Sequence, residues 1–256
     1  DYGTLGLLMP LQAIGALPTR YFQAGVFEAA ERIEGEYMAQ TILKSTDTCY
    51  ACPIACKRVV KTRDAWQVDP AYGGPEYETG ASMGSLCGVD DLPAICKAHE
   101  LCNAYGLDTI GVGAAIAWAM DCYERGLLGP ADTDGLELRF GNAGAMVQVV
   151  EQIALRTGFG AFLADGSYRA AERLGPEALQ SVMHVKRQEV PMHDPRAKYG
   201  LEIGYAVSAT GADHNHNIHD TRYETEAQIA DVRPLGIHEP LSFDDLSPAK
   251  VRLVKR

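Results

Sequence analysis

The chain has 256 residues, and 46% of them are hydrophobic, which is enough for a sizeable core and excludes a disordered protein. Its formal net charge of −11 argues against general nucleic-acid binding, because an acidic surface repels a phosphate backbone. The longest apolar run, over residues 110–120, is about half of the ~20 residues that a membrane-spanning helix needs, so no membrane span is expected.

The periodicity of apolar residues predicts a mostly helical protein. In chain order, the expected helices cover residues 21–34, 36–44, 92–105, 110–126, 142–158 and 162–174. Asp91 suits the start of the third of these helices, and Gly106 suits its end. Runs of β-branched residues predict short strands at 57–61 and 180–186, and the polar segment 191–220 is expected to be partly irregular.

The cysteine content indicates the cellular compartment. Seven cysteines in 256 residues are an odd number at modest density, unlike the dense, paired cysteines of a secreted disulfide scaffold. The sequence begins with Asp1 and shows no basic segment followed by an apolar stretch, so no secretory signal is visible. We therefore expect a reduced, cytoplasmic protein in which some of the cysteines bind a metal.

The sharpest motif is Cys49-Tyr-Ala-Cys52-Pro-Ile-Ala-Cys56, a C-x2-C-x3-C run whose three thiolates can face a common point. An iron–sulfur cube and a zinc ion each require four ligands, so a fourth ligand must come from elsewhere. The spacing favours an iron–sulfur cluster over zinc, and three unrelated buried thiols remain as a third interpretation. The other cysteines are expected in the core: Cys87, Cys96, Cys102 and Cys122.

Two glutamates, Glu76 and Glu78, lie in the glycine-rich segment 73–80, shortly after the cysteine motif. Two carboxylates near a cofactor can supply a general base. A solvated turn is the other interpretation of the same pattern.

Histidines gather in the segment 191–220, with one more shortly before it: His193, His214, His216, His219 and His184. A dense group of histidines and aspartates can be a metal site or a proton-transfer site. The spacing does not match the HExxH pattern of a zinc-binding helix, and a polar surface loop is the alternative. A further segment, 103–108, reads by itself as the end of one helix followed by the cap of the next.

In their joint order, these segments resemble the tungsten-dependent aldehyde:ferredoxin oxidoreductase family. The segments that carry the resemblance are 15–27, the cysteine motif, 74–78, 99–109, 189–196 and 211–214. Each segment is weak alone, but their order over nearly the whole chain is highly specific. The resemblance implies a mostly α fold, made of helical domains 2 and 3 of that architecture without its N-terminal β domain.

The resemblance also implies how the chain is divided. Residues 1–178 would form a helical domain with the cysteine motif and the first pterin motif, and residues 179–256 the incomplete start of a second helical domain. The chain is therefore expected to be an internal fragment of a longer protein, and the isolated fragment is expected to be inactive.

Two cofactors follow from the resemblance, a [4Fe–4S] cluster and a tungsten or molybdenum bis-pterin. Cys49, Cys52 and Cys56 would be three of the four cluster ligands. The family's pterin motif D-x-x-G-L-D/C is matched by Asn103, Gly106, Leu107 and Asp108. Asn103 stands in place of the usual first aspartate, so it would contact the pterin as a neutral amide.

Catalytic roles are implied for the acids and for two of the histidines. Glu78, in preference to Glu76, matches the acid near the metal, and His214 matches the histidine of the family's G-A-x-H segment. His193 matches a position that relatives fill with Tyr or His. An iron site between subunits is not expected, because Lys97 stands where an acid would be needed, and a homo-oligomer of another kind remains open.

The resemblance implies an enzyme that oxidises small aldehydes to carboxylic acids and passes the electrons through the cluster to ferredoxin or another electron-transfer subunit. An aryl-CoA reductase of the same family is the nearest alternative. A helical module that holds an iron–sulfur cluster or zinc without being an enzyme is the alternative from a different class.

Overall fold

The structure, a computed structural model, describes residues 2–63 and 65–254, and within them it is mostly helical, as predicted. The α-helices are α1 (Leu8–Ala13), α2 (Gly35–Thr41), α3 (Tyr77–Met83), α4 (Leu92–Tyr105), α5 (Thr109–Glu124), α6 (Ala143–Leu155), α7 (Gly158–Leu163), α8 (Ser167–Leu174), α9 (Pro176–Ser181), α10 (Tyr199–Val207), α11 (Glu226–Ile229) and α12 (Ala249–Val254). The strands are β1 (Leu43–Asp47), β2 (Lys57–Val60), β3 (His184–Val185) and β4 (Gln188–Glu189). Short 3₁₀ helices lie between them: η1 (Thr4–Leu7), η2 (Ala30–Arg32), η3 (Pro70–Tyr72), η4 (Ser85–Cys87), η5 (Pro195–Ala197), η6 (Asp220–Arg222) and η7 (Ala230–Leu235).

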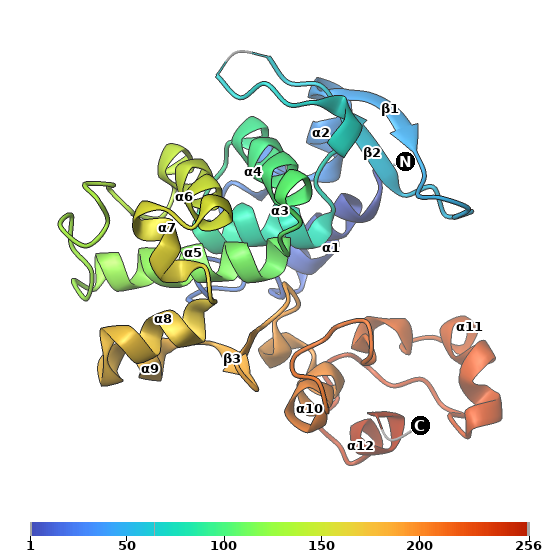
Figure 1. The fold of residues 1–256 in the computed structure, drawn as a ribbon. Coiled ribbons are helices and arrows are strands. Elements are labelled where there is room, and N and C mark those ends of the chain that lie inside the picture. The colour runs from blue at the N-terminus through green and yellow to red at the C-terminus, as the bar shows by residue number, and fades with distance from the viewer. Residues whose placement is uncertain (1, 64, 255–256) are drawn as a thin grey trace.

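Helix α5 is the centre of the core (Figure 1). Residues 112–122 on this helix are all buried, including the fully covered Trp118, because α3, α6 and α8 contact it on several sides. The approach to α3 is especially close, since a Cβ at Gly113 would lie 2.6 Å from Cβ of Ser82. Glycine at this position therefore lets α3 pack directly on the core, which fixes the helix that carries Glu78.

The corner between α4 and α5 forms as the sequence predicts. The side chain of Asp91 caps the start of α4, and Gly106 ends the helix in the left-handed conformation with a φ of 70°. Asp108 then caps α5 by accepting hydrogen bonds from two backbone N–H groups of its first turn. The predicted helix over 92–105 is confirmed.

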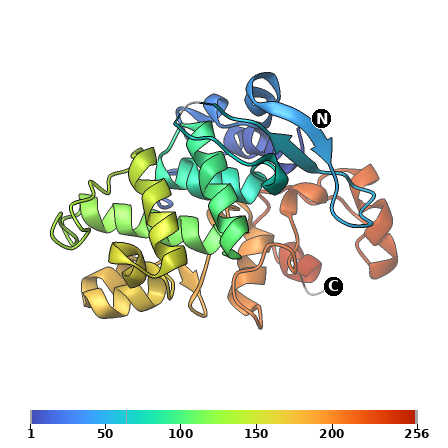
Figure 2. The same cartoon turned by 45° about the horizontal axis from the view of Figure 1, so that its top comes forward.

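The cysteine motif lies in a β-hairpin. Strands β1 and β2 pair antiparallel, with Asp47 opposite Lys57, so the loop over 48–56 connects their ends. The strand at β2 was predicted, whereas β1 was not. The hairpin loop and α11 lie at the same end of the molecule in Figures 1 and 2.

The predicted helix over 21–34 is wrong. Arg20, Tyr21 and Phe22 all have positive φ, at 43°, 50° and 63°, and only the short η2 forms later in this stretch. Left-handed backbone costs about 1–2 kcal/mol per residue, so tertiary contacts must hold it. The N–H groups of Arg20 and Tyr21 donate to the carbonyls of Ser85 and Leu86, each at 2.9 Å.

Three smaller predictions also need correction. The expected helix over 162–174 is two helices, α7 and α8, because Gly166 with a φ of 90° separates them. The expected helix over 36–44 includes Gly35 and gives way to β1 at Leu43. The expected strand over 180–186 begins as the end of α9, and only the two residues of β3 are extended.

The last quarter of the chain forms a lobe made of α10, α11 and α12 beside the main helical body (Figure 1). The lobe contains a buried ion pair, in which Nζ of Lys250 on α12 contacts Oδ1 of Asp220 on η6 at 2.5 Å. Asp220 also accepts the N–H groups of Gly200 and Leu201, at 2.8 and 3.0 Å. These bonds connect the two ends of the lobe. The proposed division of the chain at residues 178/179 stays a prediction.

Within the described residues, every helix is too short or too polar to cross a bilayer.

Candidate active site

A cavity of about 600 Å³ lies between the N-terminal helices and the segment 193–222. One wall is apolar and comes from η1, α1 and the residue after it, with Leu7, Leu11 and Ile14. The opposite wall is polar. It includes the predicted catalytic residues Glu78, His193 and His214, together with Lys198 and His219. The cavity therefore combines an apolar surface with titratable groups, as binding sites for small organic molecules do.

Glu78 is held in place by the first turn of α3. Its Oε2 accepts a hydrogen bond of 2.8 Å from the N–H of Met192, and the neighbouring Tyr77 hydroxyl donates to the carbonyl of the same methionine. The two contacts hold the residue before His193 against α3. The glycine-rich segment thus ends in a buried helix start, and the solvated turn that was its alternative interpretation is excluded.

Two histidines approach the same carboxylate oxygen. Nε2 of His193 lies 3.1 Å from Oε1 of Glu78, and Nε2 of His214 lies 3.6 Å from it. One atom from each of these three residues lies within 4.8 Å of the other two. His219 adds a third imidazole, with its ring centroid 4.6 Å from that of His193. The structure therefore brings together Glu78, His193 and His214.

Burial sets the charges of this group. The pKa of Glu78 is raised, mainly because burial penalises its charged form, although His214 opposes the shift. Burial, with the nearby charge of Lys198, lowers the pKa of His193 to about 2. Burial and the neighbouring His193 lower the pKa of His219 to about 3. Both of these imidazoles are therefore neutral near pH 7.

Lys198, which the sequence analysis did not single out, completes the site. Its side chain is 1% exposed, and its Nζ lies 2.9 Å from Nδ1 of His193. An ammonium in this position disfavours a bare divalent cation among Glu78, His193 and His214. The cluster is thus better suited to hydrogen bonding and proton transfer than to a simple metal centre. A lone lysine has no pattern in the sequence that would have revealed it.

Glu76 and Glu78 have different surroundings. Glu76 accepts a hydrogen bond from the hydroxyl of Thr4 and lines the cavity, but it does not belong to the histidine cluster. Its charge raises the pKa of the Cys56 thiol, so it lies on the side of the cysteine loop. The geometry therefore favours Glu78 over Glu76 as the acid at the reacting centre.

The three cysteines of the motif share the hairpin loop. Cys49 is exposed, whereas Cys52 and Cys56 are partly covered, and Cys56 lines the cavity. Cys49 and Cys52 both contribute to the raised pKa of Cys56, after Glu76 and burial, which places the thiols near one another. Among the described residues, however, the three Sγ atoms do not all lie within 4.8 Å of one another. As predicted, the other four cysteines are buried in the core: Cys87, Cys96, Cys102 and Cys122.

The predicted pterin motif lies at the α4–α5 corner. Asn103, Gly106 and Asp108 are exposed there, and Leu107 is partly covered. The amide of Asn103 donates to the backbone carbonyl of His99, 2.9 Å away, so this side chain is partly used inside α4. Asp108 and His214 line a second cavity of about 240 Å³, which brings this motif next to the candidate site.

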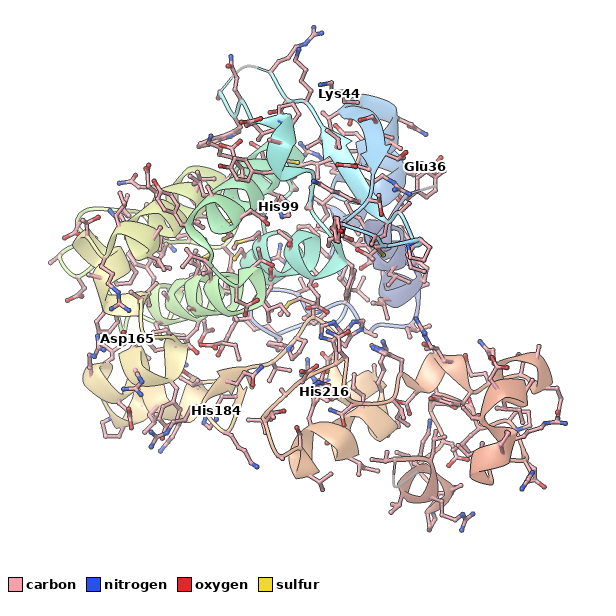
Figure 3. The ribbon with its side chains drawn as sticks, turned by 45° about the vertical axis from the view of Figure 1, so that its right-hand side comes forward. Glu36, Lys44, His99, Asp165, His184 and His216 are labelled. Atoms are coloured by element: carbon pink, nitrogen blue, oxygen red, sulfur yellow. The ribbon has the colours of Figure 1, made fainter. Side chains whose placement is uncertain are left out.

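Two histidines that the sequence groups with the others, His184 and His216, lie outside the candidate site. His184 packs its ring edge-on against Tyr168, with centroids 4.6 Å apart. His216 is largely exposed and pairs with Asp213, with 3.2 Å between Nδ1 and Oδ2. Figure 3 shows the two at separate places on the molecule. Neither residue lines the large cavity.

Comparison with known proteins identifies the class. The family described as "Aldehyde ferredoxin oxidoreductase, domains 2 & 3" matches residues 1–256, so the chain belongs to the aldehyde ferredoxin oxidoreductase family. The match confirms the predicted fold, helical domains 2 and 3.

Relatives that match over nearly the whole chain carry the name of an oxidoreductase. The chain is 38% identical to the tungsten-containing aldehyde ferredoxin oxidoreductase of Pyrococcus abyssi, over 99% of this chain and 40% of the relative. It is 39% identical to the enzyme of the same name from Pyrococcus furiosus, over 99% of this chain and 39% of the relative. The chain thus spans about 40% of the length of these relatives.

Two more distant matches show the range of the fold. The WOR-like subunit of an aliphatic sulfonate oxidoreductase from Pyrococcus furiosus is 30% identical, over 77% of this chain and 32% of the relative. Among solved structures, the active site complex BamBC of benzoyl coenzyme A reductase with 1,5-dienoyl-CoA superposes with a TM-score of 0.59. It is 19% identical and covers 76% of this chain and 29% of that chain, so it supports the fold alone.

The donor groups in the cavity fit a tungsten-bearing group. Oε1 of Glu78 is a buried acceptor with no aligned hydrogen bond, although Nε2 of His193 lies 3.1 Å away. An unsatisfied buried polar atom costs about 1–3 kcal/mol, which is expected where a bound group or substrate supplies the missing partner. The thiol of Cys56 reaches the same cavity from the hairpin loop.

Proposed function

We propose that the protein oxidises small aldehydes to carboxylic acids with a tungsten or molybdenum bis-pterin, and that a [4Fe–4S] cluster passes the electrons to ferredoxin. The observation that carries this proposal is the buried Glu78 carboxylate with a raised pKa, set beside His193 and His214 in a cavity that Cys56 also lines. A carboxylate whose pKa is raised by burial is typical of a catalytic general base.

In this proposal the overall reaction consumes one aldehyde and one water and yields one carboxylic acid, two protons and two electrons. The pterin-bound metal supplies the two-electron redox chemistry. Glu78 accepts a proton from the water that attacks the carbonyl carbon. His214 donates a hydrogen bond to the carbonyl oxygen, where negative charge develops. The apolar wall of Leu7, Leu11 and Ile14 receives the organic tail of the aldehyde.

The cofactor assignments follow the motifs. Cys49, Cys52 and Cys56 would hold the cluster together with a fourth sulfur, because an iron–sulfur cube requires four. The pterin would be contacted from the α4–α5 corner, by Asn103, Gly106, Leu107 and Asp108. The corner and Glu78 lie close enough for the charge of Asp108 to raise the pKa of Glu78, which supports a shared site.

Steady-state assays of the intact, metal-loaded protein test this function. We expect aldehyde-dependent reduction of ferredoxin by protein that contains both tungsten (or molybdenum) and iron. Parallel assays with an aryl-CoA thioester and an alkyl sulfonate distinguish other substrate classes within the family. Bound zinc without tungsten, molybdenum or iron would contradict the proposal and favour a module that is not an enzyme.

Replacing cysteines of the motif tests the cluster assignment. We expect Cys49→Ser and Cys52→Ser to lose most of their bound iron and the visible absorption of the cluster, because a serine hydroxyl is a poor substitute for a thiolate ligand. Cys122→Ala is the matched control, since this cysteine is buried in α5 away from the motif. Full iron content in both serine variants would overturn the assignment.

A further inference from the structure

Lys198 is a charged side chain in an unusual place. It precedes α10, is 1% exposed, and lines the large cavity. Lysine is almost never fully buried unless it has a partner. Lys250, which is also buried, has a carboxylate partner in Asp220. Lys198 instead contacts an imidazole, with 2.9 Å between its Nζ and Nδ1 of His193.

The direction of this hydrogen bond follows from the two protonation states. Burial lowers the pKa of Lys198 to about 8, which leaves it mostly charged at pH 7. The pKa of His193, about 2, keeps that ring neutral. An ammonium has three donors and no acceptor, so Nδ1 must accept. A neutral imidazole carries one ring proton, which is therefore on Nε2.

The other charges around Lys198 favour the same state. Asp220 and Glu78 raise its pKa against the effect of burial, and Arg222 lowers it. His214 and His219 lie with His193 on the other side of the contact, with ring centroids 5.2 and 4.6 Å from that of His193. The two acids thus stabilise an ammonium that the cavity would otherwise disfavour.

We propose that Lys198 is a positioning residue, which donates a hydrogen bond to Nδ1 of His193 and thereby holds the ring proton on Nε2, the ring nitrogen next to Glu78. The geometry supports this role, because Nε2 of His193 lies 3.1 Å from Oε1 of Glu78. The contact is not aligned as a hydrogen bond, but such contacts commonly tighten when substrate binds. His193 is then a hydrogen-bond donor in the site, and Glu78 alone is the base. The role of Lys198 in catalysis rests on the proposed function, whereas its hydrogen bond to His193 can be tested independently of that function.

Nitrogen NMR of the ring atoms tests the bond without any cofactor. In the intact, cofactor-free protein labelled with ¹⁵N-histidine, the signals that disappear in His193→Gln identify this ring. We expect a protonated Nε2 and an unprotonated, hydrogen-bonded Nδ1. In Lys198→Met the Nδ1 signal should move to the position of a nitrogen that accepts no hydrogen bond. Both neutral tautomers of the His193 ring should then be populated. Lys198→Arg should keep the wild-type pattern, as should the exposed control Lys61→Met.

Kinetics of the loaded enzyme give the second readout. We expect kcat of Lys198→Met to fall about 10- to 100-fold, with a smaller change in KM, as is usual when an orienting partner is lost, and Lys198→Arg to recover most of it. A ring proton on Nδ1 in the wild type, or an unchanged His193 spectrum in Lys198→Met, would overturn the proposal. A protein with the expected ring pattern but no aldehyde oxidation would support the role of Lys198 and reject the proposed function. If Lys198→Met does not fold, the wild-type and Lys198→Arg spectra still show which ring nitrogen of His193 carries the proton, and so test the proposal.

Discussion

We expect Glu78→Gln to lower turnover of the intact enzyme by about 10²- to 10⁴-fold, the usual contribution of a positioned general base. Glutamine is nearly isosteric and its oxygen can still accept the N–H of Met192, so the fold of α3 should be preserved. Because burial raises the pKa of Glu78, we also expect the acid limb of the wild-type rate profile to lie above the ordinary pKa of glutamate. Activity should rise as pH increases through that limb, since the base acts when ionised.

Measuring the bound metals shows whether a loss of turnover comes from the missing base or from a failure to bind the cofactors. Tungsten (or molybdenum) and iron should be the same in Glu78→Gln and in the wild type. Glu76→Gln is the matched control, because Glu76 lies two residues away, lines the same cavity and is outside the histidine cluster. We expect it to retain much more activity than Glu78→Gln. Unchanged turnover in Glu78→Gln at normal metal content would show that the base is another group.

The second large effect concerns stability. We expect Lys250→Met to lower the free energy of unfolding by about 3–5 kcal/mol, because it leaves the carboxylate of Asp220 buried without its cation. The amide groups of Gly200 and Leu201 still donate to that carboxylate, but they do not neutralise its charge. Equilibrium urea unfolding of the intact protein, followed by circular dichroism, measures the difference.

Two control variants show whether the loss of stability comes from the buried unpaired charge. Arg32→Ala breaks an exposed ion pair with Asp90 and should change stability by less than about 1 kcal/mol. The double variant Asp220→Asn with Lys250→Met removes both charges and should be more stable than Lys250→Met alone. A Lys250→Met variant as stable as Arg32→Ala would show that the buried pair does not stabilise the lobe.

Local signals in the sequence were sufficient for several elements of the fold. Helix α4 was predicted because Asp91 and Gly106 mark its ends through backbone chemistry that depends on those residues themselves. The left-handed turn at Arg20, Tyr21 and Phe22 could not be predicted, since these residue types disfavour positive φ. Its conformation depends on contacts with Ser85 and Leu86, which are distant in sequence.

The residues of the candidate site, too, could be predicted from the sequence only in part. The sequence identified Glu78, His193 and His214 by their motifs, and the structure brings both histidines to Oε1 of Glu78. Lys198 was missed because its role arises from burial and from one contact with His193. His219 was noted only as part of a histidine-rich segment, and its place in the cavity depends on how 211–222 folds back.

Anomalous X-ray scattering at the tungsten edge, on crystals of the intact, active protein, tests the central claim most directly. We predict a single strong peak of tungsten, or of molybdenum at its own edge, in the large cavity, beside Glu78 Oε1 and the imidazoles of His193 and His214. Data at the iron edge should show a second peak at the hairpin loop of Cys49, Cys52 and Cys56. A tungsten or molybdenum peak remote from Glu78 would contradict the account, even if the protein oxidises aldehydes.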